Sequence, residues 1–413
     1  MYLYKKKFKC QTILKLISDV TRHMSKDLCI TFCKDEPRHR IYKMAKGLKK
    51  YRKIKLKCIC KFLDKELYGD LFDEVINLTF LKNNQKWNFL SRVERRISER
   101  VPFYDWKVQK LLERHETDIF HCLAEPYNLP KLIINYSKNK TILDAQDFSG
   151  ISAGIENLPK QTRDLERYCL ENTDGIVHKG PKYEIEFYRK HGYKIDCPEL
   201  TYLDYCDEDL FIPINSRKLS DEDNELHIVF TGGITSDPKL RFKYYIPLAK
   251  ILAKQKIHFH IYHNPYGIIT IQPYIELDKK EKYFHLHKSV PYMELSKEIA
   301  KYDYGLWYHY PMVSDYVSLM KRKVAIGNKL SSYLEAGLPV IIGDHTEYGK
   351  KIIEKYKIGF AINEQSLDSL NSIFKKYELS KLYENVSIAR KELSIKENIS
   401  KLVSFYNRLM EED

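Results

Sequence analysis

The sequence lacks the features that carry a protein into or across a membrane. It has no run of about 18 uncharged apolar residues, which a transmembrane helix requires. Its start, MYLYKKKFKC, is followed by neither a long apolar core nor a small-residue cleavage site. None of its nine cysteines forms a CxxC pair, and five lie in apolar runs, where a reduced thiol behaves as a small hydrophobe: Cys29, Cys33, Cys58, Cys60 and Cys122. We therefore expect a protein of the reducing cytoplasm.

Familiar phosphate-binding motifs are also missing, because the sequence has neither a Walker loop nor a complete GxGxxG pattern. Apolar and aromatic residues are abundant, at 43% and 13% of 413 residues. This is enough for sizeable cores and excludes intrinsic disorder. The length excludes a toxin scaffold or a single small binding module, and it predicts two domains or three.

Positive charge is concentrated at the start of the chain. Residues 1–60 contain 18 Lys and Arg against 4 Asp and Glu, whereas the remaining residues carry equal numbers of both signs. A cluster of one sign attracts anions, so the candidate partners are anionic lipid headgroups, phosphorylated substrates and nucleic acid.

Strand and helix patterns alternate through the first half. Apolar runs at 28–33 and 54–62 indicate strands, and between them Pro37 precedes an amphipathic helical pattern. This order predicts a parallel βαβ unit. The alternation continues with strands expected at 119–124, 141–144 and 175–179 and with a helix expected at 131–137.

A stretch of linker composition at 198–224 separates this half from a second alternating series. In that series we expect strands at 227–231, 257–262, 283–286, 304–308, 339–342 and 360–362, and helices at 240–254, 293–301, 329–336 and 350–356. The predicted fold is therefore α/β, with two tandem doubly wound, Rossmann-like domains at 1–212 and 224–395 and a helix at 396–413. Open parallel sheets bind ligands at the carboxyl ends of their strands, so a ligand should lie in a cleft between the two domains.

The strongest local signal is NKLSSYLEAGLPVII at 328–342. It combines a helix start, a helix stop at Gly337, and Pro339 before a buried strand. A helix start offers free backbone N–H groups, and Lys329 adds a full positive charge, which suits a phosphate. A plain helix-to-strand turn would explain Gly337 and Pro339 but not the Asn328-Lys329 pair.

A second candidate is Thr231-Gly232-Gly233, directly after the first expected strand of the second half. Residues without a Cβ let the backbone approach a pyrophosphate closely, although a tight turn would need the same residues. Three cations follow downstream, either near this turn or on the solvated face of a helix: Lys239, Arg241 and Lys243.

With these segments the second half resembles the nucleotide-sugar-binding domain of GT-B fold glycosyltransferases, particularly the large family-four-like group. The resemblance is carried by FTGGI at 230–234, SVPYMEL at 289–295, YDYGL at 302–306 and NKLSSYLEAGLPVI at 328–341. It covers about the whole of 224–395. The first domain is similar to the acceptor domain of these enzymes in its strand rhythm and in HCLAEPYNLP and TILDAQDFSG.

The resemblance implies a donor bound against the second domain. The base is expected near Ser289 to Pro291, the ribose near Glu335, and the diphosphate between the two glycines and Lys329. The expected donor-binding residues are Gly232, Gly233, Ser289, Val290, Pro291, Asn328, Lys329, Ser332 and Glu335. Two features depart from the family pattern: Ser332 stands where many relatives carry a carboxylate, and the usual pair of glutamates eight positions apart is not evident. Fixed donors can stabilise a departing diphosphate without a metal, so we expect no metal and no cofactor besides the nucleotide sugar as co-substrate.

Candidates for a catalytic base come from the first domain, at expected strand ends or in the loop after the first strand: His39, His121, Glu125, Asp144 and Asp147. Asp147 is the first choice and His121 the second; helix capping or turn formation is the alternative for Asp144 and Asp147. An inverting enzyme needs such a base, whereas in a retaining enzyme the leaving phosphate can take the proton. The resemblance favours a retaining enzyme.

Two other patterns are compatible with metal sites. Asp-Glu-Asp runs occur at 207–209 and 221–223, where solvated turns are expected. His258 and His260 share a face of one expected strand, and His285 and His287 share a face of another. No cysteine or carboxylate has a matching spacing, so we expect hydrogen-bonded histidines and no metal.

Residues 4–20 combine a basic cluster with an apolar helical stripe, which fits a helix on an anionic bilayer as well as one packed on the first domain.

We expect a cytoplasmic glycosyltransferase of hexosyltransferase type, peripheral to the inner face of the membrane, that acts in polysaccharide biosynthesis. Its expected acceptor is a cell-surface glycan precursor or another acceptor, which can be a glycan, a lipid-linked molecule or a protein. Two alternatives are a transferase of nucleotide-activated polyol phosphate for anionic wall polymers, and a nucleic-acid-binding protein that uses the basic N-terminus. No recognised nucleic-acid module is present, so no nucleic acid is expected as a partner.

Overall fold

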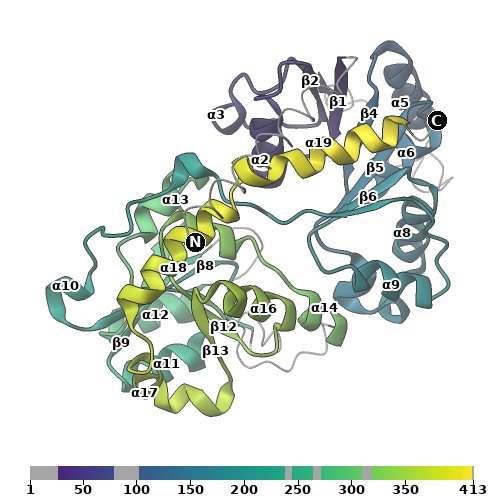
Figure 1. Ribbon diagram of the computed structural model, residues 1–413. Helices are drawn as coiled ribbons and strands as arrows, with labels where there is room; N and C mark the ends of the chain where they lie inside the picture. The colour runs from purple at the N-terminus through teal and green to yellow at the C-terminus, as the bar shows by residue number, and fades with distance from the viewer. Residues whose placement is uncertain (1–26, 79–101, 238–243, 264–270, 309–317, 412–413) are drawn as a thin grey trace, which may run out of the picture.

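The computed structural model describes residues 27–78, 102–237, 244–263, 271–308 and 318–411. They form two α/β domains, each built on a parallel sheet with helices on both faces (Figure 1). The predicted pair of tandem Rossmann-like domains is therefore confirmed. The basic segment 4–20 and the cations Lys239, Arg241 and Lys243 lie outside the described residues.

The described part of the first domain has a seven-stranded sheet in the order β3-β2-β1-β4-β5-β6-β7. Its strands are β1 (Leu28–Cys33), β2 (Ile54–Cys60), β3 (Glu74–Asn77), β4 (Ile119–Leu123), β5 (Lys140–Ala145), β6 (Gly175–His178) and β7 (Glu199–Thr201). Its longer helices are α2 (His39–Leu48), α5 (Pro102–Arg114), α6 (Asn128–Tyr136), α8 (Lys160–Asn172) and α9 (Tyr183–Lys190), with short helices α3 (Lys65–Tyr68) and α7 (Ser149–Ala153).

The second domain, over its described residues, has a six-stranded sheet in the order β10-β9-β8-β11-β12-β13. Its strands are β8 (Leu226–Gly232), β9 (Ile257–His263), β10 (Phe284–Lys288), β11 (Tyr304–Trp307), β12 (Val340–Gly343) and β13 (Gly359–Ile362). Its helices include α10 (Ser220–Asp223), α11 (Ile246–Lys254), α12 (Gln272–Lys280), α13 (Tyr292–Ile299), α14 (Leu319–Val324), α15 (Lys329–Glu335), α16 (Glu347–Tyr356), α17 (Leu370–Phe374) and α18 (Leu379–Glu392).

The last helix, α19 (Ile395–Glu411), leaves the second domain and lies along the first (Figure 1). It packs on α2 so closely that a Cβ on Gly47 would lie 2.7 Å from Ile395 Cγ2. Further along α19, the Tyr406 hydroxyl lies 2.8 Å from His121 Nδ1 of β4. The chain therefore crosses between the domains twice, and α19 joins them.

The first crossing, at 198–224, is less solvated than its composition suggests. Asp207 is fully buried and accepts hydrogen bonds from Lys46 of α2. Cys206 is also buried, and it forms an isolated parallel bridge with Ser394 near the start of α19. The expected solvated turn at 207–209 is therefore wrong for Asp207, because the two domains close around it. Within the described part of the chain, no helix has both the length and the apolarity needed to cross a bilayer.

Candidate functional site

The carboxyl ends of β8, β9 and β10 form one straight edge of the second sheet. Gly232 pairs with His263, and His263 pairs with Lys288. Because neighbouring strands are about 4.8 Å apart, Gly232 and Lys288 lie about 10 Å from each other. Ser289 and Pro291, which follow β10 at this edge, are exposed, and Val290 between them is half-buried. The segment expected to hold the base therefore lies on the same edge as the glycines expected to hold the diphosphate.

Lys329 and Gly232 come together at this edge although they are far apart in the sequence. A methyl group built on Gly232 would lie 3.2 Å from Lys329 Nζ, and the same Nζ is 5.0 Å from the ring centroid of Phe230. Gly232 has φ +141°, a backbone conformation that favours glycine. Gly233, the next residue, is half-buried. An ammonium group thus lies beside a backbone that has no side chain in the way.

Tyr333 holds α15 in this position. Its hydroxyl donates to the Leu306 carbonyl at 2.9 Å and accepts from the Thr231 N–H at 3.3 Å, so one side chain ties α15 to the ends of β8 and β11. The fully buried Tyr333 ring lies against Gly305 of β11. A Cβ on Gly305 would lie 2.3 to 2.6 Å from three ring carbons, which is far inside van der Waals contact. Gly305 therefore makes room for the ring that positions Lys329.

We expect Gly305→Ala to destabilise the second domain, because neither the buried ring nor the strand can move away. Overpacking of this kind costs about 1–3 kcal/mol, occasionally more. Thermal unfolding followed by circular dichroism measures it. Gly327→Ala is the matched control, because its Cβ would meet Trp307 at an ordinary 3.4 Å. Equal melting temperatures for the two variants would contradict this role of Gly305.

Glu335, expected near the ribose, lies in the contact between the two domains. Its carboxylate accepts from Lys43 Nζ of α2 and from the Asp207 N–H, both at 2.8 Å, and the residue is only 1% exposed. Burial raises the pKa of Glu335, although Lys43 acts in the opposite direction. In this arrangement the carboxylate is already held by two partners of the chain itself. Ser332 and Asn328 lie nearby, and the Ser332 hydroxyl is 3.4 Å from the Asn328 carbonyl oxygen.

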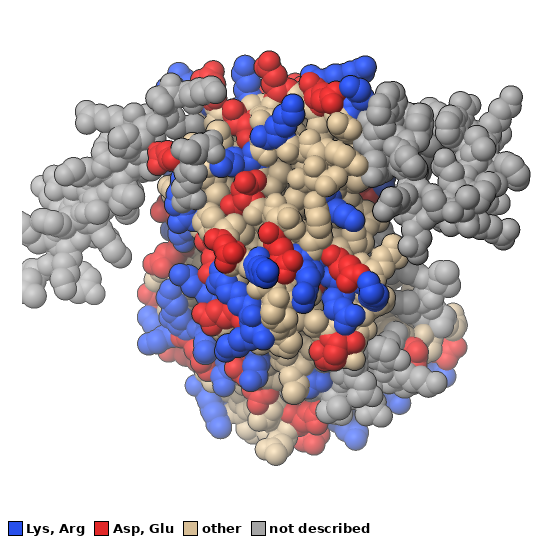
Figure 2. All heavy atoms as spheres, turned by 90° about the vertical axis from the view of Figure 1, so that its right-hand side faces the viewer, with Lys and Arg blue, Asp and Glu red and all other residues tan. Residues whose placement is uncertain are grey.

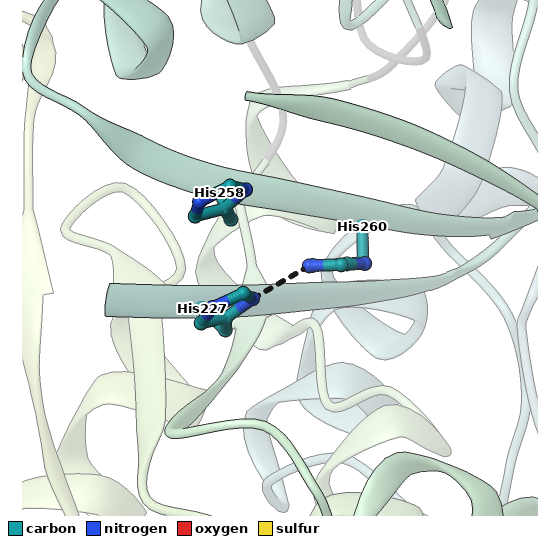
Figure 3. Close-up of side chains that lie close together, drawn as sticks. All are labelled: His227, His258 and His260. Carbon is teal, nitrogen blue, oxygen red and sulfur yellow. Dashed lines mark hydrogen bonds between the residues drawn. The ribbon is translucent and has the colours of Figure 1, made fainter. Parts of the chain in front are cut away.

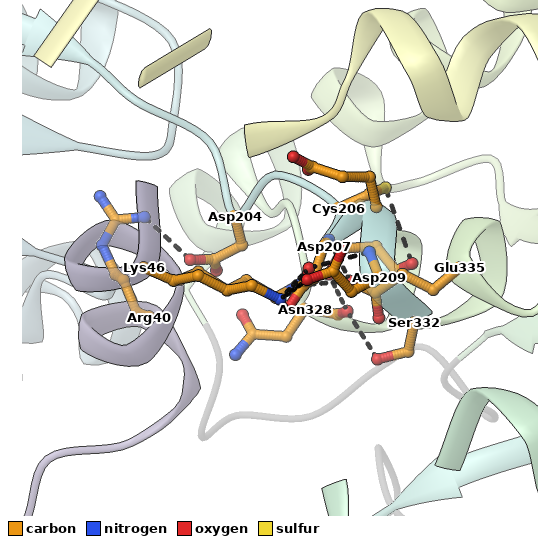
Figure 4. A network of polar contacts seen from close by, with 12 residues as sticks. Arg40, Lys46, Asp204, Cys206, Asp207, Asp209, Asn328, Ser332 and Glu335 are labelled. Atoms are coloured by element: carbon orange, nitrogen blue, oxygen red, sulfur yellow. Dashed lines mark hydrogen bonds and ion pairs between the residues drawn. The ribbon is translucent and has the colours of Figure 1, made fainter. Parts of the chain in front are cut away.

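Basic residues at every third position of α2 are bonded to carboxylates of the chain. Arg40 contacts Asp144 and Asp204, Lys43 contacts Glu335, and Lys46 contacts Asp207 and Asp209; all five closest distances lie between 2.6 and 2.8 Å. Figure 4 shows Lys46 reaching from α2 to the two aspartates. Part of the positive charge of residues 1–60 is therefore neutralised inside the molecule. On the face shown in Figure 2, basic and acidic side chains are interspersed.

A pocket of about 390 Å³ lies at the carboxyl ends of β1, β4 and β5 in the first domain. Asp147, the first choice for a base, lines it and pairs with Lys321 of α14 and, at 3.5 Å, with Lys179. Burial would raise the pKa of Asp147, but the two lysines lower it below its ordinary value. Glu125 lines the same pocket, and burial raises its pKa.

His121, the second choice, is fully buried. Its Nδ1 is bonded to Tyr406, and its Nε2 lies 3.1 Å from Asp144 Oδ2. Burial alone would raise the pKa of Asp144, but Arg40 and His121 lower it to about 2. Both ring nitrogens of His121 thus have partners inside the core, and this arrangement offers no route from the ring to an acceptor hydroxyl.

Two sets of contacts close the space between the domains on either side. On one side the His39 ring of α2 stacks on Tyr292 of α13, with centroids 3.9 Å apart. On the other side the Ser318 N–H donates to the Ser152 carbonyl at 3.0 Å, and Lys321 pairs with Asp147. Both sets of contacts therefore join segments that follow strands of the first sheet to the second domain, and Lys321 of the second domain reaches Asp147 in the first-domain pocket.

Comparisons with known proteins agree with this fold. The family described as Glucosyltransferase 3-like, C-terminal domain, matches residues 249–402, whereas no curated protein matches the sequence. HepE from Anabaena in complex with UDP superposes with a TM-score of 0.62 at 12% identity, over 92% of this chain and 100% of that one. Sucrose-phosphate synthase from Thermosynechococcus elongatus superposes with a TM-score of 0.63 at 10% identity, over 94% of this chain and 100% of that one. TarM superposes with a TM-score of 0.58 at 12% identity, over 94% of this chain and 99% of that one. The fold predicted from the sequence is confirmed: this chain has the GT-B fold of nucleotide-sugar glycosyltransferases, with a second domain similar to the C-terminal domain of the glucosyltransferase 3-like family.

Proposed function

We propose that this protein is a glycosyltransferase that moves a sugar from a nucleoside diphosphate to an acceptor hydroxyl. The observation that carries the proposal is the approach of Lys329 to Gly232 at the carboxyl edge of the second sheet, in a chain with the GT-B fold. The segment at 289–291, with Ser289 and Pro291 exposed about 10 Å along the same edge, suits the base of the same nucleotide.

The chemistry requires stabilisation of negative charge on the departing diphosphate. Lys329 supplies a positive charge, and Gly232 and Gly233 let backbone N–H groups approach the phosphate oxygens. Because these groups are fixed before the reaction, transfer needs no metal ion at the diphosphate in this proposal. The retaining outcome rests on the resemblance alone, since proton transfer to the leaving phosphate would make a protein base unnecessary.

UDP-glucose is the first donor to test. HepE has been solved with UDP and with UDP and glucose, and the matching family carries a glucosyltransferase name. For the acceptor we propose a cell-surface glycan precursor that the enzyme meets at the cytoplasmic face of a membrane, through the basic segment at 4–20.

A donor panel tests the proposal. The purified full chain is incubated with UDP-, GDP-, ADP- and CMP-linked sugars, and both binding and release of the free nucleotide are measured. We expect saturable binding and slow hydrolysis of one class, with UDP-glucose first. Absence of binding and of hydrolysis for every donor would contradict the proposal. Transfer of labelled phosphorus instead of the sugar would favour the polyol-phosphate alternative.

Asp147→Asn tests the predicted base in the first domain. If Asp147 accepts the proton of the acceptor hydroxyl, transfer should fall by about 10²–10⁴-fold while the affinity for the nucleotide stays the same. The rate of sugar transfer and the Kd of UDP are the two readouts. Glu36→Gln, which changes an exposed carboxylate lining the same pocket, is the control. A fall of less than threefold would exclude Asp147 as the base and agree with proton transfer to the leaving phosphate.

A further inference from the structure

Histidines line one face of the second sheet, two residues apart on three neighbouring strands: His227 in β8, His258 and His260 in β9, and His285 and His287 in β10. Histidines that face each other directly across two strands stack their rings. His227 stacks on His258 and His260 on His285, with centroids 4.3 Å apart in both pairs. Figure 3 shows the parallel rings of His227 and His258, and His260 bonded to His227.

Histidines on the diagonals of the same sheet are joined through their ring nitrogens. His258 Nδ1 lies 2.8 Å from His285 Nε2. In a second chain, His227 Nδ1 lies 2.9 Å from His260 Nε2, and His260 Nδ1 lies 3.0 Å from His287 Nε2. Each contact needs one hydrogen between its two nitrogens, because one nitrogen must donate and the other must accept. The five histidines therefore form one chain of two rings and one chain of three, and the expectation of hydrogen-bonded histidines on these strands is confirmed.

A carboxylate at one end of each chain fixes the direction of its hydrogen bonds. His258 Nε2 lies 2.8 Å from Glu225 Oε2, and His227 Nε2 lies 3.0 Å from Asp223 Oδ2. An ionised carboxylate only accepts, so both Nε2 atoms donate to it and the Nδ1 atom of the same ring accepts from the next ring. Five neutral imidazoles, each with its hydrogen on Nε2, satisfy every contact in both chains.

These contacts limit the number of protons that the folded protein binds here. The chain of two rings has four nitrogens and one shared contact, so it holds at most three hydrogens, against two when both rings are neutral. The chain of three rings has six nitrogens and two shared contacts, so it holds at most four, against three. Each chain thus takes up one extra proton. A second one would place two N–H groups against each other, whereas all five rings can be protonated in the unfolded chain.

The charged groups around the rings do not remove this limit. Burial is the largest cause that lowers the pKa of His285 to about 4 and that of His260 still further. Nearby carboxylates favour the first proton of each chain but make no room for a second. The groups that face the rings or their partners are the carboxylates Asp223, Glu225, Asp278, Glu298 and Asp303, the lysines Lys218, Lys282 and Lys301, and the tyrosines Tyr262, Tyr283 and Tyr302.

We propose that the two histidine chains form a pH-sensitive switch, which holds β8, β9 and β10 together at neutral pH and releases them on acidification. An unfolded histidine has a pKa of about 6.5, so well below this pH the unfolded chain binds about three more protons than the folded one. Stability rises with pH wherever the unfolded state binds more protons. The contribution is therefore fully present above about pH 7 and is lost as the pH falls below about 6.5. The same strands carry the edge with Gly232 and Ser289, so their release also removes that edge.

Urea unfolding of the full-length protein at pH values from 7 to 5 tests the proposal. Glutamine offers one donor and one acceptor, as neutral imidazole does, but it binds no proton. By the count above, His260→Gln and His285→Gln each remove one of the three protons. In each variant the unfolding constant should rise about 25-fold less between pH 7 and pH 5 than in the unmodified protein, and about 600-fold less in the double variant. The readout is this change with pH, which a uniform loss of stability does not alter.

His191→Gln is the matched control, because His191 is an exposed histidine of the first domain. Its unfolding constant should rise with acidification as in the unmodified protein. If His260→Gln does not fold at pH 7, His285→Gln decides, since His285 is half-buried at the end of its chain. A rise as large as that of the unmodified protein in the histidine-chain variants, or an equal change in His191→Gln, would overturn the proposal. No nucleotide is used, so the result stands apart from the proposed transferase activity.

Discussion

Lys329→Ala should lower kcat for sugar transfer by about 10²–10³-fold, because it removes the side-chain cation that lies beside Gly232. The loss should lie mainly in kcat, since charge on the diphosphate grows as the glycosidic bond to the donor breaks. Lys329→Arg should retain part of the activity, because it keeps the charge but displaces it. Steady-state kinetics, with the donor identified in the panel, measures kcat and KM for the unmodified protein and for both variants.

The matched control is Lys280→Ala. Lys280 is an exposed lysine at the end of α12, close to the start of β10 and therefore at the opposite edge of the same sheet. Its removal lowers the net charge by the same amount but should leave kcat within twofold. Equal losses in the two variants would mean that Lys329 acts only through overall charge, and unchanged kinetics in Lys329→Ala would remove it from the site.

Lys43→Met should destabilise the protein by about 3–5 kcal/mol. It leaves the Glu335 carboxylate, which is 1% exposed, without its cation in the contact between the domains. The remaining N–H of Asp207 cannot replace a full charge. Urea unfolding, followed by fluorescence and by circular dichroism, gives the shift in the midpoint and shows whether the domains unfold together.

The double variant Lys43→Met, Glu335→Gln separates the effect of an unpaired buried charge from the effect of the altered side-chain shape. It removes both charges and keeps an acceptor for the Asp207 N–H, so most of the lost stability should return. Lys381→Met is the surface control, because its partner Glu384 is 59% exposed and such pairs contribute about 0–1 kcal/mol. If Lys43→Met and Lys381→Met shifted the midpoint equally, the Lys43–Glu335 contact would not hold the domains together.

The sequence predicted the central strands well for a physical reason. Strands such as β4 (IFHCL) and β12 (VIIG) are buried along their whole length, so they appear as continuous apolar runs. The edge strands β3 and β7 were not predicted, because each is short and no residue of β7 is fully buried. The start of α15 at Lys329 and its end before Gly337 were predicted from residue chemistry alone.

Contacts between distant segments could not be predicted in the same way. Lys43 and Glu335 are 292 residues apart, and no local pattern distinguishes Lys43 from the other lysines of a basic stretch. The same holds for His121, which occupies a strand end in the sequence but is enclosed by α19, a helix more than 270 residues further along. By contrast, Gly305 and Tyr333 lie in segments that the family resemblance singled out, and their close packing gives a physical reason for both residues.

The central claim is that Lys329 and Gly232 together hold the diphosphate of the donor. A crystal structure of the protein with UDP tests it most directly. We predict a phosphate oxygen within about 2.7–2.9 Å of Lys329 Nζ, the phosphate chain against the backbone at Gly232, and uracil beside Ser289 to Pro291. UDP bound elsewhere on the chain, or bound at this edge with its phosphates away from Lys329, would contradict the account.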